Sequence, residues 1–183
     1  MTIFLDLVGS FIVRASLITI MLGLTVTMND TLYQSTQTAN AKGYFALLDS
    51  MIYSDVNEAG YNVTGTAFQH ADSTDIQFWG DINGGGIPET VRYYTVVSVV
   101  SGDTLYSLYR YVNNVNGGNP ILLGTTTNVK FLYYDGSGLV IPYNTNLGNI
   151  KQVKVTIVGS VENVTEGSST IMREFNIYPP NLL

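Results

Sequence analysis

The chain has 183 residues, with 8 basic residues against 14 acidic residues and a formal net charge of -6. This balance argues against nucleic acid or an anionic membrane surface as a main partner, because both attract cationic protein surfaces. The basic residues are scattered along the chain, so no local patch reverses this conclusion. The chain has no cysteine, which excludes disulfide bonds and thiolate chemistry.

The N-terminal third of the chain predicts one long helix around which the remaining residues are organised. The segment from Ile3 to Met28 is almost entirely apolar and long enough to cross a lipid bilayer. Residues 29–43 are polar, and an amphipathic stretch follows them. A helix from Ile3 to Ala59 would extend for about 85 Å, further than a small domain is wide. We therefore expect its first half to protrude from the folded domain.

Two charged residues, Asp6 and Arg14, interrupt the apolar segment. An unpaired charge at the centre of a bilayer costs about 2.5–3.5 kcal/mol on insertion scales. Eight residues span about 12 Å along a helix, so Asp6 and Arg14 of one chain are poorly placed to pair with each other. We expect Asp6 of one subunit to meet Arg14, or the free N-terminus, of another subunit.

Gly23 marks the weakest part of the predicted helix. The run Thr25-Val26-Thr27 follows it, and both glycine and β-branched residues lower helix propensity. We expect regular helix to be lost locally between Ile18 and Thr27 in an assembled state, which would let neighbouring subunits pack at staggered heights. Asp6, Arg14 and Gly23 are therefore the candidate assembly residues.

The second half of the helix is predicted to cover a β-sheet. An apolar stripe recurs there at helical spacing, formed by Tyr44, Leu48, Met51, Ile52 and Val56. Gly60 provides a helix stop of the left-handed kind, and the periodicity changes after it. We divide the chain into a hydrophobic assembly or membrane half-helix at 1–29, an amphipathic half-helix at 30–60 and a β domain at 61–183, with 30–183 as one globular unit.

The residues after Tyr61 predict β-strands, because their segments are rich in Val, Ile, Tyr, Phe and Thr. Short glycine-rich turns separate several of them, which favours an antiparallel meander covered by the second half of the helix. The predicted strands are Asp75 to Trp79, Thr90 to Val99, Thr104 to Val112, Pro120 to Leu123, Asn128 to Tyr134, Ile150 to Val161 and Ser169 to Tyr178.

The segment from Asp81 to Glu89 begins like a calcium-binding loop. Asp81, Asn83 and Glu89 place oxygen ligands at its first, third and ninth positions, with glycine at the sixth. Arg92 occupies the twelfth position, where a bidentate glutamate is expected, and a glycine-rich strand connection explains the same residues. Ca²⁺ is thus a candidate ligand, and no other cofactor is expected.

The sequence does not favour an enzyme. His70 is the single histidine, and we expect it in a surface loop, because no motif near it resembles a nucleophile turn. The glycine-rich loop at residues 84–86 lacks the lysine and the following helix of a phosphate-binding loop.

Several segments, in this order, resemble the type IV pilin and type II secretion pseudopilin superfamily, with the J-like and W-like minor members most similar. The segments are Asp55-Val-Asn-Glu-Ala-Gly-Tyr61, Ser73-Thr-Asp-Ile-Gln-Phe78, Gly80-Asp-Ile-Asn-Gly84, Val129-Lys-Phe-Leu-Tyr-Tyr-Asp135, Ile150-Lys-Gln-Val-Lys-Val-Thr-Ile157 and Phe175-Asn-Ile-Tyr-Pro-Pro-Asn-Leu182. The family's glutamate at the fifth mature position is Leu5 here. If Met1 is the mature terminus, Asp6 is a displaced substitute for that glutamate; the alternative is that Met1 is the initiator and processing differs from that of the family.

The resemblance implies an α+β pilin-like fold, in which the second half of a long protruding helix packs on an antiparallel β-sheet domain. It implies a structural subunit of an extracellular helical filament at the cell surface, which polymerises with copies of itself through its hydrophobic N-terminal helix. Such a subunit resides in the inner membrane before assembly. The alternatives are a minor pseudopilin of a secretion or uptake apparatus, and a membrane-anchored binding module.

Overall fold

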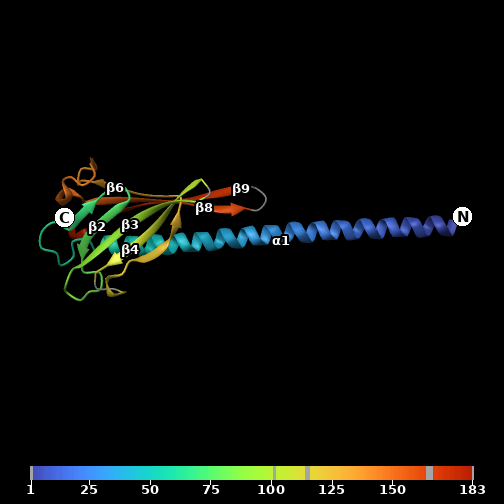
Figure 1. Ribbon diagram of the computed structural model, residues 1–183, viewed down its shortest axis with the longest axis horizontal. Coiled ribbons are helices and arrows are strands. Elements are labelled where there is room, and N and C mark those ends of the chain that lie inside the picture. Colours follow the sequence, from blue (N-terminus) through green and yellow to red (C-terminus); the bar gives the residue numbers. More distant parts are fainter. Residues whose placement is uncertain (1, 101, 114–115, 164–166, 183) are drawn as a thin grey trace.

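The computed structural model describes residues 2–100, 102–113, 116–163 and 167–182. A single long helix, α1 (Thr2–Asn57), precedes a domain built on two antiparallel sheets. The C-terminal part of α1 lies against this domain, and its N-terminal part extends away as a rod (Figure 1). The structure thus has the predicted α+β architecture with a protruding N-terminal helix.

The first sheet is a meander in which each strand pairs with the next one along the chain. Its strands are β1 (Phe68–Ala71), β2 (Asp75–Gly80), β3 (Glu89–Val100), β4 (Asp103–Val112) and β5 (Ile121–Thr126), with the short helix η1 (Asn116–Gly118) before β5. β2 pairs with β3 only as far as Tyr94, and β5 pairs with β4 only from Tyr106 onward. The end of the β3–β4 hairpin therefore extends beyond its neighbours as a two-stranded ribbon.

The second sheet has the strand order β7-β6-β8-β9. Its elements are β6 (Asn128–Tyr134), β7 (Val140–Ile141), the short helix η2 (Leu147–Asn149), β8 (Gln152–Asn163) and β9 (Gly167–Ile177), and the short helix η3 (Pro180–Leu182) follows. The expected continuous meander is wrong from this point, because the backbone N–H of Thr127 donates to the carbonyl of Val158 and β6 begins a new sheet beside β8.

All seven predicted strands are present, with ends that differ by a few residues. β1 and β7 were not predicted, because strands of 4 and 2 residues carry too little periodicity to be recognised in a sequence. Both lie at an edge of their sheet, where each pairs with only one neighbouring strand.

The buried stripe of α1 is formed by Phe45, Leu48, Ile52 and Val56. The prediction of Met51 in this stripe is wrong, since its side chain is 38% exposed. Consecutive residues of a helix are separated by about 100° around its axis, so Met51 is turned away when Ile52 faces the core. Tyr44 is half-buried at the margin of the stripe.

Two glycines allow the helix to approach the sheets closely. A Cβ at Gly159 of β8 would overlap the ring of Phe45, and a Cβ at Gly124 of β5 would overlap the ring of Tyr44. The Tyr44 hydroxyl also donates a hydrogen bond to the carbonyl of Leu123. Because β5 belongs to the first sheet and β8 to the second, these contacts tie α1 to both sheets.

Candidate functional site

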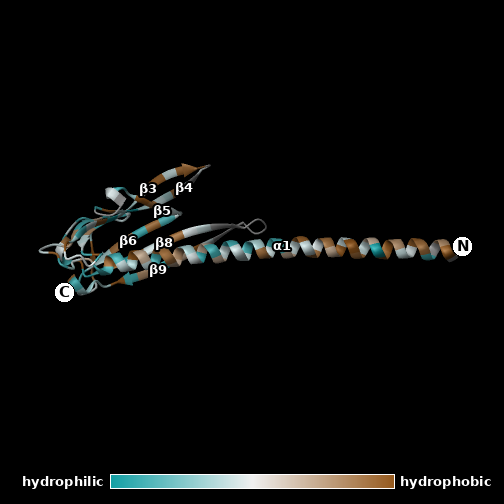
Figure 2. Cartoon of the chain, turned by 90° about the horizontal axis from the view of Figure 1, so that it is seen from below, coloured by the Kyte–Doolittle hydropathy of each residue, from teal (hydrophilic) through white to brown (hydrophobic). Residues whose placement is uncertain are grey.

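The N-terminal half of α1 is apolar on every side and lies entirely outside the domain (Figure 2). Its exposed apolar side chains are Ile3, Phe4, Leu7, Val8, Phe11, Ile12, Val13, Leu17, Ile18, Ile20, Met21, Leu22, Leu24, Val26 and Met28. By length and composition this helix could cross a membrane. A helix that is hydrophobic all round is normally buried in lipid or in other protein, so this half requires an apolar environment.

Threonine hydroxyls in this half of α1 have hydrogen-bond partners in the helix itself. Thr19 donates to the carbonyl of Ala15 at 2.9 Å, and Thr25 and Thr27 donate to the carbonyls of Met21 and Gly23 at 2.8 Å and 3.0 Å. Such bonds let a threonine enter an apolar environment without an unsatisfied polar group.

α1 is unbroken through residues 18–27 in the single chain. A Cβ added at Gly23 would meet no atom within 4 Å, so packing within one chain does not require glycine there. The expected loss of regular helix concerns an assembled state, and it stays a prediction.

Asp6 and Arg14 are both exposed, and no ion pair between described residues involves either of them. The helix thus provides hydrogen-bond partners for its threonine hydroxyls but no ion-pair partner for the described charges of Asp6 and Arg14. An apolar environment would require both charges to find partners outside the chain.

Where α1 meets the first sheet, it buries a carboxylate in a polar cluster. Asp55 is 7% exposed, and Arg110 of β4 donates to it through Nε at 2.6 Å and Nη2 at 3.1 Å. The Tyr93 hydroxyl of β3 donates to the same carboxylate at 2.6 Å. Burial, together with the neighbouring Asp55 carboxylate, raises the pKa of Tyr93 well above its ordinary value.

This cluster was not predicted, although the sequence contains a signal for it. Asp55 follows Ile52 by three residues and precedes Ala59 by four, so helical spacing places it on the buried face. A carboxylate on that face needs a cationic partner from the sheet. The cluster fixes α1 to the first sheet.

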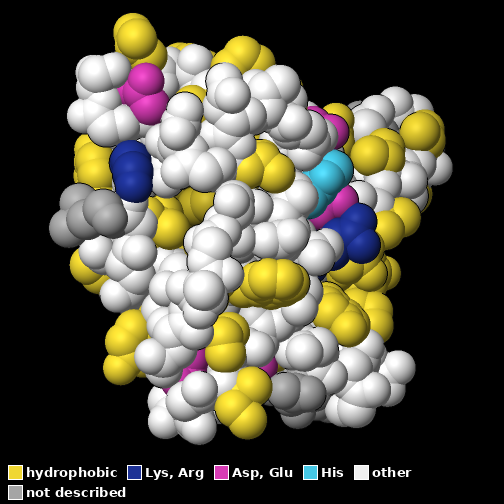
Figure 3. Space-filling view, turned by 90° about the vertical axis from the view of Figure 1, so that its left-hand side faces the viewer, with side chains coloured by type: hydrophobic (Ala, Val, Ile, Leu, Met, Phe, Trp, Pro, Cys, Tyr) yellow, Lys and Arg dark blue, Asp and Glu magenta, His cyan; other side chains and the backbone are white. Residues whose placement is uncertain are grey.

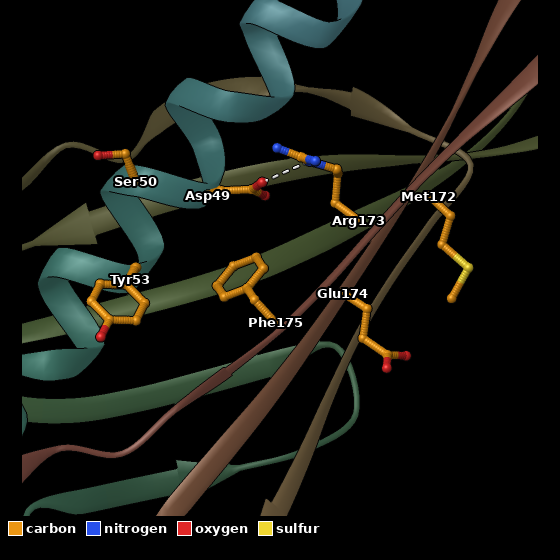
Figure 4. Close-up of a pocket in the computed structure, with 7 residues that line it drawn as sticks. All are labelled: Asp49, Ser50, Tyr53, Met172, Arg173, Glu174 and Phe175. Carbon is orange, nitrogen blue, oxygen red and sulfur yellow. Dashed lines mark hydrogen bonds and ion pairs between the residues drawn. The ribbon is translucent and has the colours of Figure 1, made fainter.

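A second ion pair joins α1 to β9 beside a pocket of about 520 Å³ (Figure 4). Arg173 Nε lies 2.9 Å from Asp49 Oδ2, and Asp49 Oδ1 is buried without a hydrogen-bond partner among the described residues. Tyr53 and Phe175 line the same pocket. Because Arg173 is half-exposed, we regard this pair as a weak clamp between helix and strand.

Asp81, Asn83 and Glu89, the candidate calcium ligands, form hydrogen bonds within the loop between β2 and β3. Asp81, which is 2% exposed, accepts bonds from the backbone N–H groups of Gly85 at 2.9 Å and Gly86 at 2.7 Å. Glu89 accepts bonds from the backbone N–H of Ile82 at 3.2 Å and from the Asn83 side chain.

Burial by itself would raise the pKa of Asp81. Hydrogen bonds from the Asn62 side chain and from the backbone of Gly84, Gly85 and Gly86 outweigh burial and hold this pKa below its ordinary value. The Asn62 side chain donates at 2.7 Å. The ionised carboxylate is therefore the form that closes the loop.

These contacts do not favour calcium. A cation at Asp81 and Glu89 would compete with the N–H groups that now occupy their oxygens, and Ca²⁺ needs 6–8 oxygen ligands. Among the described residues, no three His, Cys, Asp or Glu side chains lie close enough to share a metal ion. A self-closed turn explains the sequence of this loop, and the calcium hypothesis stays a prediction.

The expectation that His70 lies in a loop is wrong, because His70 is part of strand β1. Its Nε2 lies 3.8 Å from Asp75 Oδ2, and Arg92 donates to the same carboxylate through Nε at 2.9 Å and Nη2 at 2.5 Å. The imidazole therefore lies at the margin of a salt bridge within the first sheet.

No protein-family model, no curated protein and no solved structure matches this chain. The exposed apolar half of α1 is the feature that a function must explain.

Proposed function

We propose that this protein is the structural subunit of a pilin-like helical filament that polymerises through the N-terminal half of α1. The observation that carries this proposal is a rod that projects from a folded domain and on which 15 of the described side chains are large, apolar and exposed. That much apolar surface cannot remain in water, and side-by-side packing with the same segment of other copies removes it.

The small residues of the rod favour close packing of helices. Gly9, Ser16 and Gly23 are spaced seven residues apart. Seven residues make nearly two turns of a helix, so each of these residues is rotated by only about 20° around the axis from the one before it. A Cβ at Gly9 or Gly23 would meet no atom within 4 Å in the single chain. A strip of small residues lets a neighbouring helix approach closely, as it does in helix pairs within membranes.

The charges of the rod distinguish a polymer from a simple anchor. A monomer in a bilayer would leave Asp6 and Arg14 unpaired at a cost of several kcal/mol, whereas a polymer can join Asp6 of one copy to Arg14 of another. Their axial separation of about 12 Å would then set the step between the two copies. Before assembly, the same rod holds the subunit in the membrane.

The test is assembly of the full chain purified in detergent, followed by electron microscopy after the detergent is removed. The native chain should form filaments, and Asp6→Asn or Arg14→Leu alone should reduce their yield at least tenfold. The exchange Asp6→Arg with Arg14→Asp should restore part of the yield. The matched control is Asp30→Asn, which makes the same chemical change outside the apolar segment and should assemble normally.

Other outcomes separate the alternatives. A native chain that stays monomeric in detergent and in vesicles would support a membrane-anchored binding module and contradict the filament. Normal filaments from either single variant would exclude the pairing of Asp6 and Arg14. In the source cells, a minor pseudopilin would be a trace component of sheared surface filaments, whereas the proposed subunit would be the main protein band.

A further inference from the structure

The ribbon at the end of the β3–β4 hairpin is an exposed apolar surface distinct from the rod of α1. Val96, Val97, Val99 and Val100 are between 48% and 70% exposed, and residues 95–100 contain no charged side chain. Two paired strands alone are marginally stable in water, and an uncharged β-branched edge tends to pair with another chain. We call this surface the valine tip.

The valine tip points toward the end of the domain from which α1 projects (Figure 1). It also diverges from α1, so that the tip and the rod do not touch (Figure 2). The tip is therefore free to meet a domain that lies beside the rod of its own chain.

The opposite end of the domain has an apolar pocket of about 790 Å³ formed by the β6–β7 turn and the segment after β9. Tyr178, Pro179 and Pro180 line one part of it, and residues 135–138, which include Asp135, line another. Lys151 and Gln152 complete the lining, so the apolar surface has a polar margin. Leu139, which is 68% exposed, follows this turn. Its carbonyl accepts a hydrogen bond from the backbone N–H of Asp135, and its own N–H donates to the Asp135 side chain. Figure 3 views this end of the molecule, where hydrophobic side chains reach the surface between charged ones.

We propose that the valine tip of one copy docks in the Tyr178–Pro180 pocket of a second copy of this chain. The inference rests on the proposed filament, in which the α1 rods are parallel. Copies displaced along the common axis by roughly the length of β3, about 40 Å for twelve residues, bring the tip of one to the pocket end of the other. This displacement exceeds the step of about 12 Å between copies joined by Asp6 and Arg14, so the docking joins copies that lie further apart along the filament.

Two features of the chain favour this pairing. The tip and the pocket are different surfaces at opposite ends of the domain, so their contact is heterologous, and a heterologous contact that does not close into a ring produces an open polymer. The groove between α1 and β9 fits the tip less well, because the buried Asp49 Oδ1 there would stay without a partner beside valine.

The absence of native cysteine provides a direct test in the full chain. Filaments of the double variant Val97→Cys/Leu139→Cys are treated with a short bismaleimide and analysed on a denaturing gel. We expect a ladder of covalent oligomers beyond the dimer, because each copy contributes both halves of the contact. Each single variant should stay largely monomeric on the gel.

The matched control is Val97→Cys/Ile87→Cys. Ile87 is 70% exposed and lies in the β2–β3 loop at the same end of the domain, on the other side in Figure 1. This pair should give at least fivefold less ladder than the first pair. Equal ladders from both pairs would mean random collision and would overturn the proposed contact, and dimers from Val97→Cys alone would replace it with a tip-to-tip contact.

The two proposals fail in different ways. Native filaments in micrographs without a ladder from Val97→Cys/Leu139→Cys overturn the docking and leave the filament intact. A native chain that never assembles overturns the filament, and the docking fails with it. Val97→Asp gives a second measurement, because a charge in the contact should lower filament yield while near-ultraviolet circular dichroism of the domain stays unchanged.

Discussion

Removal of the buried carboxylate of Asp55 should destabilise the domain much more than removal of the Asp49 carboxylate on the same helix. Breaking a buried ion pair leaves an uncompensated charge and costs about 3–5 kcal/mol. The Arg110 side chain is 15% exposed, so water can solvate it in part, and the lower end of that range, about 3 kcal/mol, applies to Asp55→Ala. The orphaned Tyr93 hydroxyl adds about 1 kcal/mol.

A loss of about 3–4 kcal/mol should lower the midpoint of thermal unfolding by roughly 10 °C in a chain of this size. Unfolding of the full chain in mild detergent is followed by near-ultraviolet circular dichroism, which reports tertiary packing in the domain and not the helicity of the rod. Asp49→Ala is the matched control, because it removes the same side chain from the same helix.

The control should change the midpoint by less than about 3 °C, since the half-exposed Arg173 gives a pair worth about 0–1 kcal/mol. An apolar triple variant, Asp55→Leu with Arg110→Met and Tyr93→Phe, should recover most of the lost stability because no buried charge remains. Equal effects of Asp55→Ala and Asp49→Ala would refute the assignment of the buried cluster as the main clamp between α1 and the first sheet.

Three further outcomes are expected. Gly159→Ala should lower the free energy of unfolding by about 1–3 kcal/mol, measured with a denaturant, because the new Cβ meets the Phe45 ring. The control Gly43→Ala, whose Cβ would meet no atom within 4 Å, should be neutral or stabilising. Equal effects of the two variants would contradict the close contact. Burial raises the pKa of Asp81, but hydrogen bonds to its carboxylate outweigh burial and hold the pKa in the folded state below the ordinary 3.8. The ionised carboxylate therefore stabilises the fold fully above about pH 3.8, and this stabilisation is lost as the pH falls through the lowered pKa. Asp81→Asn should therefore lower stability at neutral pH, flatten the stability profile below about pH 4, and behave alike with and without added Ca²⁺; a Ca²⁺-dependent rise in the native midpoint would restore the calcium hypothesis. Gly23→Ala should favour continuous helix by about 0.5–1 kcal/mol and so reduce filament yield or change the filament's axial step in micrographs, and unaltered filaments would exclude local unwinding at this residue.

The sequence by itself determined the long helix, the longer strands and the fold class. Each of these follows from local periodicity, with apolar residues at helical spacing in α1 and β-branched or aromatic runs in strands such as Asn128–Tyr134, which the structure reproduces residue for residue. The sequence also places Asp81, Asn83 and Glu89 in one short loop, because they lie within nine residues of one another.

Only the tertiary structure decided which surfaces are buried and which remain free. The partners of Asp55 lie 38 and 55 residues away along the chain, and periodicity carries no information about such distant contacts. The second sheet begins where Thr127 bonds to Val158, 31 residues further on, so the sequence order of strands could not predict it. The valine tip is exposed because β2 and β5 end before it, and that depends on the lengths of paired strands, which are set by contacts between distant segments.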